Sequence, residues 1–154
     1  MGAILRLHLS RLRASRRGAV AVEFALVAPV FLLLVFGTMV FALYFATFAA
    51  VIQGASEGAR ASVGGLTGAE RDQLARARVR DLLGGYRPLL DPDRATVETQ
   101  ALAGAMPSYR VSVSYPVGDF GFGWFYGFLG ALGDGSAQAP QTVSYSVTVA
   151  NGGY

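Results

Sequence analysis

The sequence predicts an α+β protein in which a long N-terminal transmembrane α-helix precedes a small domain with one helix packed on a three-stranded antiparallel sheet. Residues 24–51 are mostly apolar and carry no formal charge, residues 68–83 place apolar positions at helical spacing, and the C-terminal part alternates apolar and polar residues. We therefore expect a basic leader over residues 1–18, the apolar helix and its extension over residues 19–62, and an extracytoplasmic α+β domain over residues 63–154.

The leader is positively charged. Five of the 13 arginines, among them Arg16 and Arg17, precede Gly18, and no acidic residue does. By the positive-inside rule, such a flank keeps the N-terminus in the cytoplasm and places the C-terminal domain on the other side of the membrane. A separate role of the leader at a membrane surface or on nucleic acid is the alternative. The net charge of +3 comes from this leader, so the remainder lacks the basic surface that nucleic-acid binding needs.

The apolar run from Phe24 to Val51 is long enough to cross a bilayer. Its 28 residues would form a helix of about 42 Å, against a hydrocarbon core of about 30 Å, so the helix should project beyond the bilayer. A cleavable secretory signal has a shorter apolar core, so we expect this segment to stay in the protein. Pro29 removes one backbone hydrogen bond within the run and is expected to kink the helix.

Small residues recur every four positions along this helix and its extension. They are Thr38, Ala42, Ala46, Ala50, Gly54 and Gly58. Small residues at this spacing permit the close approach of a second helix. The alternative interpretation is that alanine and glycine are simply abundant in this part of the chain.

The extracytoplasmic domain is predicted to begin with a helix from Gly68 to Leu83. Thr67 and Glu70 have the spacing of a capping box at the start of that helix. Strict alternation in SYRVSVSYPV and TVSYSVTVA predicts two half-buried strands, and residues 95–103 form a weaker third. Three strands with one face packed on a helix are the smallest such sheet expected to be stable.

An aromatic, glycine-rich segment, residues 120–132, separates the last two strands and is expected to be a loop. A possible contact patch within it consists of Phe122, Trp124, Phe125 and Tyr126. Either the loop is a lid over the open end of the sheet, or its aromatic side chains are exposed to a partner or to the bilayer interface. The segment is too short to be a second membrane span.

Residues that could form an active site or a metal site are scarce. The chain has no Cys or Lys, and its single histidine lies in the leader, so neither a catalytic triad nor a typical zinc site can be assembled after Gly18. Asp91 and Asp93 flank Pro92, a pattern typical of a turn, with calcium binding as the alternative. The sequence therefore predicts a protein that is not an enzyme and that uses no metal or cofactor.

Glu23 places a carboxylate at the beginning of the apolar run, where an unpaired charge is unfavourable. Arg16 and Arg17 lie upstream, and their long side chains could reach it. The second candidate is a new α-amine on Ala19, formed if the peptide bond after Gly18 is cut. That amine would lie one helical turn from Glu23 and would be equally available to the Glu23 of a neighbouring subunit.

A basic leader that ends in Gly18, followed by Glu23-Phe24 and a long apolar helix, resembles the prepilin signal of type IV pilins and pseudopilins. The stretch RRGAVAVEFALVAPVFLLL, with Pro29, and the later QGASEGARAS are similar to the TadE-like minor pseudopilins of the tight-adherence (Tad) pilus machinery. The resemblance covers residues 16–62. It implies that a membrane prepilin peptidase cleaves after Gly18, and that Glu23 acts in assembly or promotes cleavage.

The resemblance further implies a minor pseudopilin of a Tad-type (type IVb, Flp) pilus that supports pilus assembly, adherence and secretion. The implied partners are the prepilin peptidase, other pilins and pseudopilins, the inner-membrane assembly platform and the lipid bilayer, with no nucleic acid. The implied location is the bacterial inner membrane, as a single-pass protein with its C-terminal domain in the periplasm or in an extracellular pilus. The alternative is a signal-anchored periplasmic binding module with an uncleaved leader.

Overall fold

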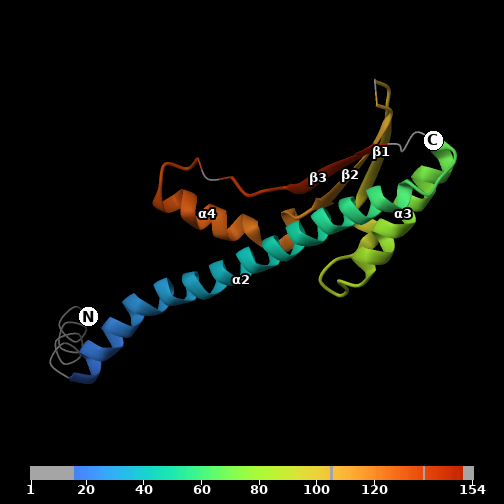
Figure 1. The fold of residues 1–154 in the computed structure, drawn as a ribbon. Coiled ribbons are helices and arrows are strands. Elements are labelled where there is room, and N and C mark those ends of the chain that lie inside the picture. The colour runs from blue at the N-terminus through green and yellow to red at the C-terminus, as the bar shows by residue number, and fades with distance from the viewer. Residues whose placement is uncertain (1–15, 105, 137, 151–154) are drawn as a thin grey trace. The chain divides into compact units, whose positions relative to one another are not determined.

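A computed structural model describes residues 16–104, 106–136 and 138–150 (Figure 1). The chain divides into two compact units, with the boundary between Met39 and Val40. A long apolar helix is followed by a small domain in which helices pack on a three-stranded antiparallel sheet, so the predicted fold class is confirmed. The elements are α2 (Arg16–Ser62), α3 (Gly68–Gly84), η1 (Pro92–Arg94), β1 (Thr96–Leu102), β2 (Ser108–Pro116), η2 (Gly118–Phe120), α4 (Phe122–Leu132) and β3 (Thr142–Ala150).

The three strands form one antiparallel sheet with β2 in the centre. Alternate side chains of β2, from Tyr109 to Tyr115, are buried on one face, and the residues between them are less buried. Val113 pairs with Val97 of β1 and with Tyr145 of β3, so the apolar face continues onto both neighbouring strands. This period of two is the pattern that predicted the strands.

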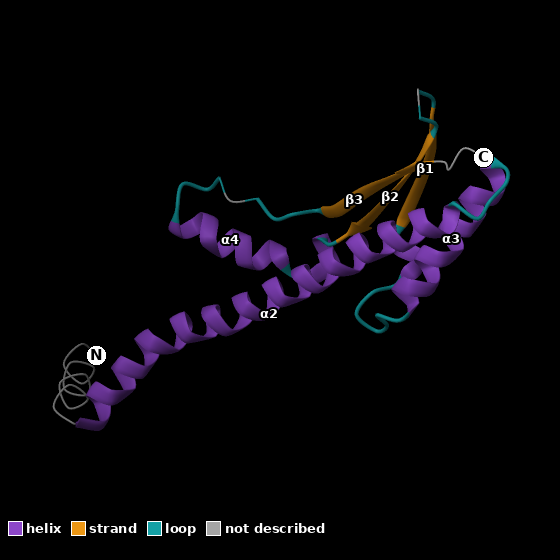
Figure 2. Ribbon diagram, in the orientation of Figure 1, coloured by secondary structure: helices purple, strands orange, loops and turns teal. Residues whose placement is uncertain are grey.

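Two helices pack on the apolar face of the sheet, where the sequence predicted one (Figure 2). From Val40 onward, α2 belongs to the same compact unit as the sheet and lies beside α3. The buried helical side chains of this core are Ala50, Val51, Ala55 and Ala59 from α2, and Ala75, Val79 and Leu83 from α3. The small side chains of α2 explain why a second helix covers the sheet. They allow α2 to pack closely against the core instead of projecting into solvent.

The α3 helix matches its prediction within one residue. The Thr67 hydroxyl accepts a hydrogen bond from the Glu70 backbone N–H at 3.2 Å, and the Glu70 carboxylate accepts one from the Thr67 N–H at 3.1 Å. This reciprocal pair satisfies two backbone donors that the helix leaves unpaired. The predicted capping box is therefore confirmed.

The expectation that residues 120–132 form a loop was wrong, because Phe122–Leu132 form the helix α4. Gly121 precedes it with a φ of +81°, a conformation that glycine adopts without strain, so this glycine begins the helix instead of interrupting it. Phe122, Phe125 and Tyr126 have the spacing of one helical face, which packs against α2. Tertiary packing thus stabilises a helix despite its glycines.

Gly58 lies where α2 passes closest to α3 and the sheet. A Cβ atom at this position would lie 2.8 Å from Val79 Cγ2, 3.3 Å from the Ala75 carbonyl oxygen and 3.5 Å from Val111 Cγ1. Gly54, one turn earlier, has room for a Cβ, which would lie 3.7 Å from Val79 Cγ1. Glycine is therefore required sterically at Gly58 but not at Gly54.

Gly58→Ala is expected to lower the free energy of unfolding by about 1–3 kcal/mol, because the added methyl group overpacks the contact with Val79 and the α3 backbone. Gly54→Ala is the matched control and should be neutral or stabilising, since alanine gains about 1 kcal/mol of helix propensity over glycine. The measurement is thermal unfolding of the detergent-solubilised chain followed by near-ultraviolet circular dichroism. Equal midpoints for the two variants would contradict the close contact.

Candidate assembly site

Within the first compact unit, α2 exposes large apolar side chains on all sides. Val30, Phe31 and Leu32 follow one another directly, and all three are exposed, so large apolar side chains point to different sides of this helix. In the part of the chain that the structure describes, α2 is the one helix long and apolar enough to cross a membrane. Pro29 lies inside α2, which continues through it.

Glu23 and Phe24 lie near the beginning of α2, and both side chains are exposed. Gly18 and Ala19, on either side of the predicted cleavage site, lie in the first turn of the same helix. Leader residues 1–15 and the side chains of Arg16 and Arg17 lie outside what the structure describes. The Glu23 carboxylate is thus accessible on an apolar helical surface, one turn beyond Ala19.

The small residues predicted for helix packing lie in two environments. Ala42 is exposed and Ala46 is half-buried, whereas Ala50, Gly54 and Gly58 are buried. The neighbouring residue at both glycines is Val79 of α3 in the same chain. The C-terminal part of the row therefore contributes to the core of this domain, and its N-terminal part remains accessible to another helix.

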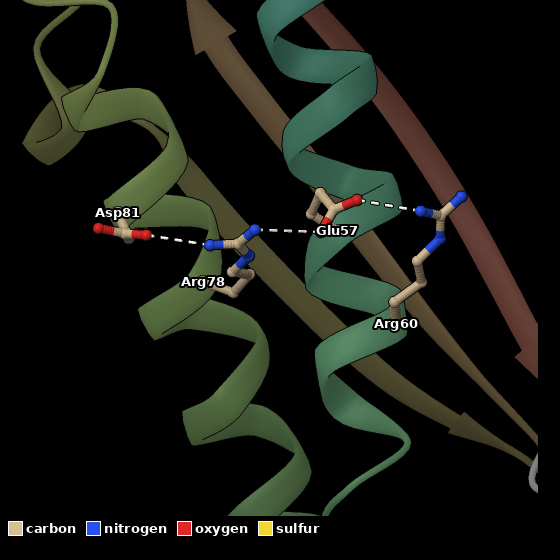
Figure 3. A network of polar contacts seen from close by, with 4 residues as sticks. All are labelled: Glu57, Arg60, Arg78 and Asp81. Carbon is tan, nitrogen blue, oxygen red and sulfur yellow. Dashed lines mark hydrogen bonds and ion pairs between the residues drawn. The ribbon is translucent and has the colours of Figure 1, made fainter.

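An ion-pair network joins α2 to α3 beside Gly58 (Figure 3). Arg78 of α3 donates one hydrogen bond to Glu57 of α2 at 3.3 Å and one to Asp81 at 3.1 Å. Arg60 donates to the same Glu57 carboxylate at 3.1 Å. Since the network is partly exposed, it stabilises the domain only modestly, but it fixes how the two helices lie along each other. Of the two charged residues in the sequence EGAR, Glu57 pairs directly with α3, whereas Arg60 pairs with Glu57 within α2.

The aromatic side chains of α4 divide between a buried and an exposed face. Phe122 and Phe125 are 1% and 6% exposed, and their rings lie 5.8 Å from Tyr44 and Phe41 of α2, respectively, in edge-to-face geometry. Trp124 is 50% exposed. Two members of the predicted contact patch, Phe122 and Phe125, are therefore internal packing residues.

The exposed surface of α4 contains residues that the predicted contact patch missed. Phe128 and Leu129 are 43% and 36% exposed, whereas Tyr126 of the predicted patch is half-buried. The spacing of four between Trp124 and Phe128 is the signal that places both on one helical face. The intervening glycines favour a loop interpretation of the same stretch.

Residues 18–60 match the family model of TadE-like proteins. The matched residues lie within α2 and include Glu23, Pro29 and the EGAR sequence. The resemblance identified in the sequence is thereby confirmed for this segment, which the family links to the Tad pilus system. A single apolar helix at the N-terminal end is consistent with a membrane-anchored component of that system. No curated protein and no solved structure matches the chain.

Another polar contact, outside the TadE-like segment, joins α3 to the sheet. Arg76 Nε donates to both carboxylate oxygens of Asp72, at 2.8 and 2.9 Å, and the Thr99 hydroxyl of β1 donates to the same carboxylate. The hydrogen bonds from Arg76, and secondly from Thr99, lower the pKa of Asp72 below its ordinary value. The Asp72 hydrogen bond raises the pKa of Arg76. The ionised carboxylate therefore ties a helix residue to the edge strand.

Asp72→Asn is expected to reduce stability at neutral pH and to have little effect in strong acid. The pKa of Asp72 is lower in the folded chain than in the unfolded chain. Its stabilising effect is therefore complete above the unfolded pKa of about 3.9 and is lost as the pH falls through the folded value. Because the Asp72 and Arg76 side chains are 37% and 42% exposed, we expect about 1 kcal/mol or less.

The measurement is the unfolding midpoint of wild type and Asp72→Asn at neutral pH and near pH 2. Thr99→Val is the matched variant, since it removes the hydroxyl donor and leaves the Arg76 pair. It should show a smaller effect with the same pH dependence. If Asp72→Asn lowered the unfolding midpoint by the same amount at both pH values, the charge of the carboxylate would not contribute to stability.

Proposed function

We propose that this protein is a minor pseudopilin, a structural and assembly subunit of a Tad-type pilus, and that it has no catalytic activity. The observation that carries the proposal is the TadE-like match over residues 18–60, which coincides with a helix whose N-terminal part exposes apolar side chains around one carboxylate, Glu23. In this role the protein supports pilus assembly, adherence and secretion. Its partners are the prepilin peptidase, other pilins and pseudopilins, and the inner-membrane assembly platform.

In the proposed topology, α2 anchors the chain in the bacterial inner membrane. The arginine-rich leader stays in the cytoplasm, in keeping with the positive-inside rule. The domain after the helix lies in the periplasm and, if the subunit enters the filament, in the extracellular pilus. The exposed apolar surface between Val20 and Met39 is suited first to lipid and then to the helices of other subunits.

The proposed processing step cuts the peptide bond after Gly18 and leaves a free α-amine on Ala19. Ala19 and Glu23 are separated by one turn, about 6 Å along the helix axis. In a bundle of parallel helices, the Glu23 carboxylate of one subunit can pair with the Ala19 amine of the next. An ion pair between helices in a low-dielectric surrounding is much stronger than one in water, so this pair would favour the correct axial offset between subunits.

Gly18→Val is expected to prevent cleavage, because a branched side chain is placed directly before the bond to be cut. The measurement is the mass and N-terminal sequence of the protein extracted from membranes of cells that contain the prepilin peptidase and the pilus machinery. Wild type should begin at Ala19, and Gly18→Val should keep its leader. Ala21→Val is the control, with an added branched side chain away from the bond.

Two outcomes would overturn the proposed processing. Wild-type protein with an intact leader would favour the signal-anchored binding module, in which Glu23 pairs with arginines of the leader. Gly18→Val protein that begins at Ala19 with normal yield would show that the peptidase does not depend on this glycine.

Glu23→Leu is expected to leave the protein in the membrane but to lower its recovery with other pilins by about tenfold or more. Breaking a buried ion pair costs about 3–5 kcal/mol, because the remaining charge has no partner. The measurement is co-purification with other pilin subunits after detergent extraction, with the mass of the mutant determined in parallel. Glu23→Gln, which keeps the shape and removes the charge, should behave like Glu23→Leu.

The same experiment separates the two roles of Glu23. If Glu23→Leu begins at Ala19 and is lost from complexes, the carboxylate acts in assembly. If the leader remains attached, the carboxylate acts in cleavage. Normal cleavage together with normal recovery would remove Glu23 from the proposed mechanism.

A further inference from the structure

We propose that the free edge of β3 is a docking site for an extended strand donated by a different subunit of the pilus machinery. The occupant is a segment without charged residues in which apolar and small polar side chains alternate. The inference rests on the proposed function, which supplies the neighbouring subunits. It concerns Thr142–Ala150, outside residues 18–60, the part that matches the TadE-like family.

One side of β3 presents backbone groups that β2 does not use. Among the described residues, β2 is the one strand that pairs with β3. The Val117 N–H donates to the Gln141 carbonyl oxygen at 2.9 Å, and the same register continues along β3. Because bonded and non-bonded residues alternate in an antiparallel pair, every second residue of β3 directs its N–H and C=O away from β2. These residues are Thr142, Ser144, Ser146, Thr148 and Ala150.

This edge lacks the features that usually keep a sheet from pairing with another chain. Such edges are commonly protected by charged side chains, by proline or by a bulge. The β3 sequence, TVSYSVTVA, contains neither a charged residue nor a proline. Its register with β2 runs without a bulge from Thr142 to Ala150. The edge is therefore suited to the addition of a strand, in which backbone hydrogen bonds provide much of the affinity.

The opposite edge of the sheet, β1, is protected. Glu98 places an exposed charge on this strand, and the Thr99 hydroxyl donates to Asp72 of α3. Arg76 of α3 lines one pocket together with Glu98 and Thr99, so side chains of the helix reach this edge. The two edges thus differ in charge and in cover, and β3 is the edge suited to a partner.

The two faces of β3 define the side chains that a docked strand needs. On the side of the helices, Tyr145 is 40% exposed and Val147 is half-buried. On the other side, Ser144 and Thr148 expose their hydroxyls. Since residues directly opposite each other share a face, apolar side chains would cover Tyr145 and Val147, and small polar ones would lie beside the hydroxyls. A charged residue opposite β3 would lose water without gaining a partner.

The direction of α2 argues against a second copy of this chain as the occupant. Gly58 lies beside Val111 of β2, whereas Tyr44 contacts Phe122 and connects through Phe120 to Tyr115 at the other end of β2. From Tyr44 to Gly58, α2 therefore runs opposite to β2 and in the same direction as β3.

Two free β3 edges can meet with their helices on the same side of the joined sheet only if the strands are antiparallel. The N-terminal ends of the two α2 segments would then point in opposite directions. Both chains are proposed to enter one membrane through those ends, so this pairing does not fit. The remaining edge of a second copy is β1, which is protected. A different subunit is therefore the proposed donor.

Hydrogen exchange tests whether the edge is open in the subunit alone. The measurement is residue-resolved amide exchange of the detergent-solubilised full chain by nuclear magnetic resonance. The outward N–H groups of Ser144, Ser146 and Thr148 should exchange about tenfold or more faster than those of Tyr145 and Val147, which face β2. Equal protection of the two sets would show that another part of the chain already covers the edge, and would overturn the proposal.

Ser144→Pro tests whether the edge is used. Proline removes an outward N–H and leaves the bonds with β2, as at natural edge positions. Recovery with other pilin subunits, after detergent extraction of cells that contain the pilus machinery, should fall about tenfold, as expected when a hydrogen bond is lost and its acceptor is left unpaired. Ser144→Ala is the matched control, because it keeps the N–H. It should be recovered like wild type, and far-ultraviolet circular dichroism should be the same for all three. Recovery of Ser144→Pro at the wild-type level would overturn the proposal.

A photocross-link identifies the occupant without a proline. Benzoylphenylalanine in place of Tyr145, in the same cells, should cross-link to an extended, uncharged segment of another pilin subunit. The same group in place of Leu66, which is 92% exposed and lies between α2 and α3, should not give this product. A cross-link to a second copy of the chain, or to a charged or helical segment, would overturn the proposal.

These measurements separate the docking edge from the proposed function. Wild type that is recovered with pilin subunits but gives no cross-link from position 145 would overturn the docking edge and leave the function intact. Wild type that is recovered with no pilin subunit would contradict the proposed function, and with it this inference.

Discussion

The contact of Gly58 with Val79 and Val111 brings α2, α3 and the central strand together at one point. A three-stranded sheet has little apolar surface of its own, so its stability depends on how closely helices can cover it. Because Gly58 has no side chain, α2 approaches α3 closely enough for Arg78 to reach Glu57 across the two helices. The domain is thereby built directly onto the end of α2, without a linker between anchor and core.

This arrangement gives one helix two kinds of surface. Up to Met39 the exposed side chains of α2 are large and apolar, while from Ala50 onward the buried positions are filled mainly by alanine and glycine. Large apolar side chains suit lipid and loosely packed helices, and small ones suit a close-packed core. The change in side-chain size along α2, with no break in the helix, therefore marks where the anchor ends and the domain begins.

Sequence patterns predicted the elements whose determinants are local. The alternation from Tyr109 to Tyr115 and the capping box of Thr67 each express a rule that acts over a few residues. The helix α4 was missed because its glycines oppose helix formation locally, and only the contacts with Phe41 and Tyr44 offset that preference. The candidate assembly site at the start of α2 was predicted from Gly18 and Glu23, because the motif that contains them is a short stretch of sequence. The partners of Gly58 and Asp72 lie in distant segments, and no local pattern indicates them.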